Sequence, residues 1–128
     1  MGLTKGALAV SLRALLAETI GENLRHTVER FGAREALVVR DQDYRATYAE
    51  LWEQVDLVAR GLLARGVEKG DRVGIWAPNR FEWFVTQFAT ARTGAILVNI
   101  NPAYKAMELE HALNKVGVKL LIHSRGFR

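Results

Sequence analysis

Apolar residues recur three or four positions apart in two stretches of the first half of the chain. Each stretch follows a threonine that has a glutamate three residues later, Thr19 with Glu22 and Thr47 with Glu50, which is typical of a capping box. The pattern therefore predicts two amphipathic helices, each ended by a glycine. The apolar positions on the two predicted faces are Leu24, Val28, Phe31, Leu51, Val55, Val58 and Leu62.

Two short β-prone runs lie between these helices, at residues 35–40 and 44–47. The residues that separate them, 41–43, are Asp, Gln and Asp, which favour a turn. The segment is therefore predicted to form a β-hairpin.

From Arg72 onward, short apolar runs at 72–77, 95–100 and 118–122 alternate with amphipathic stretches that begin near Arg80 and Lys105. This order predicts a right-handed βαβαβ unit with parallel strands. The run 95–100 is apolar at nearly every position, which indicates a sheet covered on both faces. The helix after Arg80 is expected to present one face made of Phe81, Phe84, Phe88 and Ala91. The predicted fold class is α/β: an N-terminal helix and a β-hairpin, followed by a parallel βαβαβ unit.

Composition narrows the class of protein without naming a function. The 128 residues are 49% hydrophobic and 25% charged, which fits one globular domain or a large piece of one. The chain has no cysteine, so disulfides, thiolate metal sites and a cysteine nucleophile are excluded. The net charge of +4 comes from basic residues spread over several elements rather than from a stripe, which disfavours a nucleic-acid partner.

Residues 1–18 are expected to form an extended or weakly helical lead-in. The apolar run at 7–12 resembles the start of a signal peptide, but Arg13 and Glu18 interrupt it early. It is also too short to span a membrane. Together with the absence of cysteine, this favours a cytoplasmic location.

Three predicted strands end in polar residues, and ligands usually lie beyond the carboxyl ends of parallel strands. Asn79 with Arg80 could hold an anion at a helix N-terminus, although the favoured interpretation is that Asn79 caps the helix. Asn101 follows the second strand and His123 the third. We expect Asn79, Asn101 and His123 to line this edge of the sheet without acting as catalysts.

Other sites are disfavoured by the residues present. The loop after residue 76 has no glycine and contains Pro78, so it does not fit a dinucleotide-binding turn. His26, His111 and His123 are far apart, and no two of them have the spacing of metal ligands on one helix. The sequence therefore predicts no catalytic residue and no metal site.

Seven short segments, taken in order, give the chain a recognisable pattern. They are residues 19–24, 48–51, 66–73, 78–83, 91–95, 99–104 and 107–109. Over residues 14–128 the chain resembles the N-terminal segment of acyl-CoA synthetases of the adenylate-forming, or AMP-binding, superfamily. The motifs are more similar to those of medium- or long-chain fatty-acid ligases than to those of luciferases or peptide-synthetase modules.

The resemblance implies a parent enzyme that uses ATP, Mg²⁺ and CoA to convert a fatty acid into its thioester. Residues 19–128 are then the N-terminal part of an AMP-binding domain, truncated before the phosphate loop, which would follow Arg128. The family's catalytic motifs also lie downstream, so none of its catalytic positions carries over to this chain. The implied partner is the remainder of the ligase.

Three functions remain open from the sequence. The first is a scaffold fragment of an acyl-CoA synthetase that is inactive alone. The second is a stand-alone interaction or oligomerisation module derived from such an enzyme, because a partial sheet exposes an edge that can pair with another chain. The third and weakest is a flavodoxin-like nucleotide binder.

Overall fold

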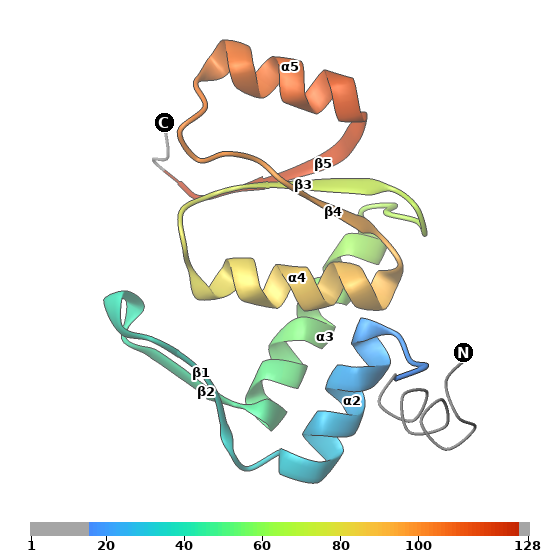
Figure 1. The fold of residues 1–128 in the computed structure, drawn as a ribbon, viewed down its shortest axis with the longest axis vertical. Coiled ribbons are helices and arrows are strands. Elements are labelled where there is room, and N and C mark those ends of the chain that lie inside the picture. Colours follow the sequence, from blue (N-terminus) through green and yellow to red (C-terminus); the bar gives the residue numbers. More distant parts are fainter. Residues whose placement is uncertain (1–15, 126–128) are drawn as a thin grey trace, which may run out of the picture.

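A computed structural model of the chain describes residues 16–125 (Figure 1). In chain order the elements are α2 (Ile20–Phe31), β1 (Glu35–Val39), the 3-10 turn η1 (Arg40–Gln42), β2 (Tyr44–Thr47), α3 (Tyr48–Ala64), β3 (Arg72–Trp76), α4 (Phe81–Thr93), β4 (Ile96–Asn99), α5 (Ala106–Val116) and β5 (Val118–His123). Every predicted helix and strand is therefore present, and the α/β class is confirmed. The expected conformation of residues 1–15 lies outside the described part of the chain.

Both predicted capping boxes are confirmed. The hydroxyl oxygen of Thr19 accepts a hydrogen bond from the backbone N–H of Glu22, and the Glu22 carboxylate accepts one from the N–H of Thr19. Thr47 and Glu50 repeat this exchange at the start of α3. Each box satisfies two backbone donors that the first helical turn leaves without a partner, so both helix starts are fixed by local sequence.

The strands form two separate sheets. β1 and β2 form the predicted antiparallel hairpin, and β3, β4 and β5 form a parallel sheet in the order β4-β3-β5. The chain passes from β3 through α4 to β4 and then returns past β3 through α5 to β5. Figure 1 shows the consequence, because α4 and α5 cover opposite faces of the parallel sheet.

The main core lies on the α4 face of the sheet, where α2 also packs against α3 and α4. Its members are Leu24, Leu51, Val55, Ala59, Leu62, Val67, Val73, Val85 and Ala89. Val85 and Ala89 are the deepest apolar positions of α4, whereas Phe81, Phe84 and Phe88 are only half-buried against this core. The buried face of α4 therefore lies about one residue further along the helix than the predicted face. The phenylalanines of the predicted face lie at the margin of the interface.

The predicted cover on both faces of the parallel sheet is confirmed (Figure 1), but β4 itself is only partly buried. This strand has a single neighbour among the described residues, and the side chain of Ile96 is 49% exposed. The strand buried on both faces is β3, in which residues 73–76 are all buried. A central strand of three is covered by helices above and below and by a strand on each side, whereas β4 lies at the edge.

The turn between α3 and β3 is tied to β5 by a polar contact. The Asp71 carboxylate accepts hydrogen bonds from the Glu68 backbone N–H at 2.7 Å and from the Lys119 ammonium at 2.8 Å. Lys119 also donates to the carbonyl of Gly66 at 2.6 Å. These contacts give a structural reason for the motif at residues 66–73.

Candidate functional site

The candidate site is a crevice at the carboxyl ends of β3 and β5. The connection after β3 runs to one face of the sheet, and the connection that enters β5 comes from the other face, so the strand order reverses between these two neighbours. Ligands of open parallel sheets usually bind outside such a reversal point. The crevice has a volume of about 390 Å³ and is lined by Ile75, Ala77, Arg80, Glu82, Trp83, Ile122, His123, Ser124 and Arg125.

The crevice combines apolar side chains from the ends of β3 and β5 with a charged rim from the start of α4 and the residues after β5. Arg80 lies 3.3 Å from the Glu82 carboxylate, a long contact for an ion pair. Among residues 16–125, the guanidinium of Arg125 has no ion pair. The rim therefore presents two cations and one carboxylate.

Gln42, from the hairpin, fixes the α4 end of the crevice. Its side-chain oxygen accepts a hydrogen bond from the Phe81 N–H at 2.7 Å, and its amide nitrogen donates to Glu82 at 3.0 Å. The Tyr44 and Phe81 rings stack beside this contact, with centroids 3.8 Å apart and planes inclined by 3°. Gln42 thus acts as the N-terminal cap of α4 although it lies 39 residues earlier in the sequence.

This geometry corrects the expected role of Asn79. The residue at the N-cap position of α4 is Arg80, which makes no side-chain capping hydrogen bond, and Asn79 is exposed in the preceding loop. The cap was missed because nothing in the local sequence around residue 80 points to a glutamine in the hairpin.

The other predicted lining residues have different positions. His123 lines the crevice, and its Nδ1 lies 3.1 Å from the Ser124 carbonyl. A carbonyl oxygen only accepts, so this contact requires a hydrogen on Nδ1. Asn101 does not line the crevice; its side-chain oxygen accepts from the Ala103 N–H at 2.9 Å and stabilises the turn at Pro102. The crevice thus contains one of the three predicted lining residues.

The carboxyl group of Glu82 is held in its ionised form. Partial burial acts to raise its pKa, but hydrogen bonds from Gln42, its own backbone and Arg80 outweigh burial and hold the pKa below the ordinary value. Glu82 therefore contributes a negative charge at neutral pH and has no tendency to act as a general acid there. Within the described residues, no group of three histidine or acidic side chains is placed to hold a metal ion.

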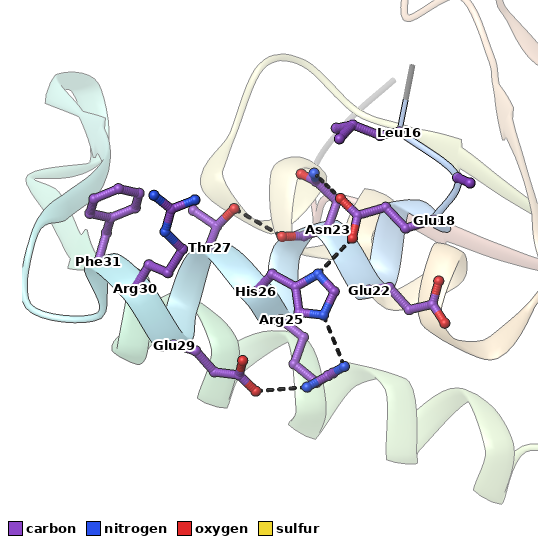
Figure 2. Close-up of a pocket in the computed structure, with 11 residues that line it drawn as sticks. Leu16, Glu18, Glu22, Asn23, Arg25, His26, Thr27, Glu29, Arg30 and Phe31 are labelled. Carbon is purple, nitrogen blue, oxygen red and sulfur yellow. Dashed lines mark hydrogen bonds and ion pairs between the residues drawn. The ribbon is translucent and has the colours of Figure 1, made fainter. Parts of the chain in front are cut away.

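A second hollow, of about 760 Å³, lies along α2 and the residues before it. Figure 2 shows contacts among several of its polar side chains. The Glu18 carboxylate accepts from Asn23 at 2.7 Å and lies 2.6 Å from Nδ1 of His26, whose Nε2 is 3.2 Å from Arg25. Arginine only donates, so Nε2 accepts, and the ring hydrogen lies on Nδ1, toward Glu18.

These contacts give the second hollow a structural role. The hydrogen bond from Asn23, with His26 and Arg25, lowers the pKa of Glu18 and keeps it ionised. Arg25 is also paired with Glu29 at 2.7 Å. Glu18, Arg25 and Glu29 are thus engaged by neighbouring side chains of the hollow, and the Arg30 guanidinium lies over the Phe31 ring, 5.2 Å from its centroid. We take the crevice at β3 and β5, where Arg125 has no ion pair among the described residues, as the better candidate for a ligand.

Comparison with known proteins identifies similar proteins for most of the chain. A family model described as AMP-binding enzyme matches residues 24–127. The human medium-chain acyl-CoA ligase ACSF2, described as mitochondrial, is 51% identical over 114 residues, which are 89% of this chain and 18% of that protein. The ACSF2 protein of Danio rerio is 44% identical over 119 residues, which are 93% of this chain and 20% of that protein.

Solved structures agree with the sequence comparisons. The N-terminal domain of FACL13 from Mycobacterium tuberculosis is 33% identical and superimposes with a TM-score of 0.80. The match covers 83% of this chain and 27% of that domain. The chain therefore spans about a fifth of the length of the curated relatives that it matches and about a quarter of the solved domain.

Proposed function

Because the chain belongs to the family of AMP-binding enzymes, we propose that it is the N-terminal scaffold of an ATP-dependent acyl-CoA synthetase and is inactive by itself. The 51% identity to human ACSF2 over 114 residues carries this proposal. In the proposed parent reaction, a carboxylate attacks the α-phosphate of ATP to give an acyl-adenylate and pyrophosphate, and the CoA thiol then displaces AMP. The names of the relatives favour a medium-chain acid.

The scaffold role is supported by how the chain uses its acidic side chains. Asp71 and Glu82 accept hydrogen bonds that join separate segments, Glu18 accepts one from the start of the adjacent helix α2, and the pKa of each lies below its ordinary value. Carboxylates that stay ionised and bound in this way serve as fixed acceptors rather than as proton-transfer groups. We assign no contact with ATP, Mg²⁺ or CoA to residues 16–125 in the proposed ligase chemistry.

Two measurements test the proposal. The 128-residue chain alone should not catalyse ATP–pyrophosphate exchange with octanoate. A chimera in which the chain replaces the 114-residue stretch that it matches in human ACSF2 should catalyse exchange and form octanoyl-CoA. A chimera that also carries Leu51→Asp is the control, because a buried carboxylate in the core should prevent folding and abolish activity. Exchange by the chain alone, or a folded chimera without activity, would contradict the proposal.

Self-association is the second candidate function. In the described part of the chain, β4 and β5 each pair with β3 only, so each has an outer edge with backbone groups available for another strand. Light scattering of the purified chain separates the candidates: a dimer or larger assembly at micromolar concentration supports an interaction module, and a monomer contradicts it.

The location of the protein and its contact with membranes do not depend on whether it is a scaffold fragment or an interaction module. No helix in residues 16–125 is long and apolar enough to cross a membrane. The expected cytoplasmic location stays a prediction, since the ACSF2 relatives carry the word mitochondrial in their names. Titration of the chain with AMP and adenosine tests the weaker alternative, a nucleotide binder.

A further inference from the structure

The crevice at the carboxyl ends of β3 and β5 has two chemically distinct parts. Ile75, Ala77 and Ile122 provide an apolar surface, and Trp83 adds a flat indole beside it. The opening carries the guanidinium groups of Arg80 and Arg125, together with other polar residues. A concave apolar surface with a few convergent polar groups is the usual form of a small-molecule site.

The contacts around Glu82 leave positive charge available at the opening. The Glu82 carboxylate receives a 3.0 Å hydrogen bond from Gln42, while its contacts with Arg80 are longer, at 3.3 and 3.4 Å. Arg80 is thus only weakly engaged, and Arg125 has no ion pair among the described residues. Guanidinium groups bind carboxylates and phosphates through paired N–H donors, so an oxyanion is the complementary group.

We propose that this crevice binds a small organic anion. Its carboxylate or phosphate contacts Arg80 and Arg125, and its apolar or aromatic part lies against Trp83 and Ile122. The volume of about 390 Å³ lies within the range of small-molecule pockets. This site is independent of the proposed ligase function, because binding requires no turnover and no residue outside the described part of the chain.

Nuclear magnetic resonance of the ¹⁵N-labelled 128-residue chain tests the proposal. Octanoate and AMP are the two organic anions, and octan-1-ol and adenosine are their uncharged counterparts. We expect at least one anion to shift the Trp83 indole N–H and the backbone signals of residues 122–125 to saturation. Its uncharged counterpart should bind about tenfold more weakly, since it lacks the charge-assisted hydrogen bonds. Saturation by octanoate identifies a carboxylate as the ligand group, and saturation by AMP a phosphate.

Either of two results of this titration would overturn the proposal. One is the absence of saturable shifts in the crevice with both anions. The other is equal binding of the charged and uncharged compounds, which would leave no role for the arginines.

Charge variants provide a second, sharper test. Arg80→Gln and Arg125→Gln should each weaken binding of the anion about tenfold. Arg65→Gln is the matched control, because Arg65 is exposed at the end of α3, away from the crevice, and should leave binding unchanged. Equal weakening by all three variants would show general attraction by a basic protein and would overturn the site.

Glu82→Gln distinguishes an electrostatic site from a merely structural effect. The substitution keeps the shape of the side chain but removes the only negative charge among the crevice-lining residues. Binding should therefore become tighter, by about threefold, as expected for one partly screened charge. A variant that folds like the unmodified chain but binds the anion more weakly would contradict the proposed arrangement.

Discussion

Helices cover both faces of the parallel sheet (Figure 1). The side chains under those helices are buried to different extents. On the α4 face, Leu51, Val55 and Ala89 are almost inaccessible to solvent and belong to one continuous core. On the α5 face, no residue of the helix is fully buried, and Met107 is 85% exposed. The same α/β architecture thus contains one densely packed layer and one thin layer.

The difference arises from the number of elements on each face. α2 and α3 add a second layer behind α4, so residues of α3 and α4 are enclosed from several directions. α5 contacts the sheet from one side, and α2 and α3 lie across the sheet from it (Figure 1). We therefore expect the stability of the chain to depend mainly on the α2–α3–α4 layer, with α5 contributing less.

The largest expected effect is on the packed face. Leu51→Ala should lower the free energy of unfolding by about 2–5 kcal/mol, because it leaves a cavity in an enclosed core. Leu113→Ala is the matched change in α5, where the leucine is half-buried, and it should cost only about 1 kcal/mol. Urea unfolding of both variants measures the difference. Equal losses would show that the two faces contribute equally and would invalidate the comparison.

The next effect concerns the cap that joins the hairpin to the packed layer. Gln42→Ala removes the acceptor for the Phe81 N–H and should cost about 1–2 kcal/mol, the usual range for a lost helix cap. It should also speed hydrogen exchange in the first turn of α4. Gln54→Ala, at an exposed position of α3, is the control and should change stability little. Unchanged exchange in the Gln42 variant would argue against the capping role.

The caps of this protein show which features a sequence can reveal. Thr19 with Glu22 and Thr47 with Glu50 could be predicted because both halves of each capping box lie within four residues. Gln42 could not, because its partner is 39 residues away and depends on how the hairpin lies against α4. Local hydrogen-bond patterns can therefore be predicted from sequence, whereas contacts between elements require the fold.

The same distinction applies to the candidate site. The rule that ligands lie beyond strand ends was enough to select His123. Arg125 follows the same strand but was not singled out, and Trp83 was missed, because their position in the crevice depends on β5 lying next to β3 and on the rotation of α4. The strand order β4-β3-β5 leaves no trace in the spacing of apolar residues, so the crevice itself was not predictable from the pattern.

A smaller effect is expected at Gly74, on the thin face. Its neighbours Val73 and Ile75 point toward the opposite face, because side chains alternate along a strand. A methyl group at Gly74 would lie 3.1 Å from Ile100 and Val118 and 3.3 Å from Leu121, all at the ends of side chains. These ends can shift under the loosely packed α5, and alanine reduces the freedom of the unfolded chain, so Gly74→Ala should cost at most about 1 kcal/mol.

Urea unfolding measures the cost at Gly74, with Gly61→Ala as a control. Gly61 lies in α3, where an added methyl group would have no atom within 4 Å, so alanine should stabilise the chain by about 0.5–1 kcal/mol through its better helix propensity. A loss of several kcal/mol at Gly74 would mean that the α5 face is packed as rigidly as the core.

The smallest effect on stability is expected from the contact of Asp71, in the turn before β3, with Lys119 of β5. It is tested by varying the pH. Hydrogen bonds from Lys119 and Glu68 lower the pKa of Asp71 below its ordinary value of 3.8, so the unfolded chain binds a proton there more readily than the folded chain. Asp71 therefore stabilises the folded chain above pH about 4, and this stabilisation is lost as pH falls through the lower pKa that Asp71 has in the folded chain.

The contact between Lys119 and Asp71 also loses its stabilising effect at high pH. The hydrogen bond to Asp71 raises the pKa of Lys119 above 10.5, so its contribution is present below that value and is lost as pH rises through the higher folded value. Asp71→Asn should reduce both dependences, seen as a flatter plot of the urea midpoint against pH. Lys119→Gln should remove the dependence of the urea midpoint on pH at alkaline pH and reduce it at acid pH. Parallel plots for the unmodified chain and both variants would show that this exposed pair adds nothing to the attachment of β5.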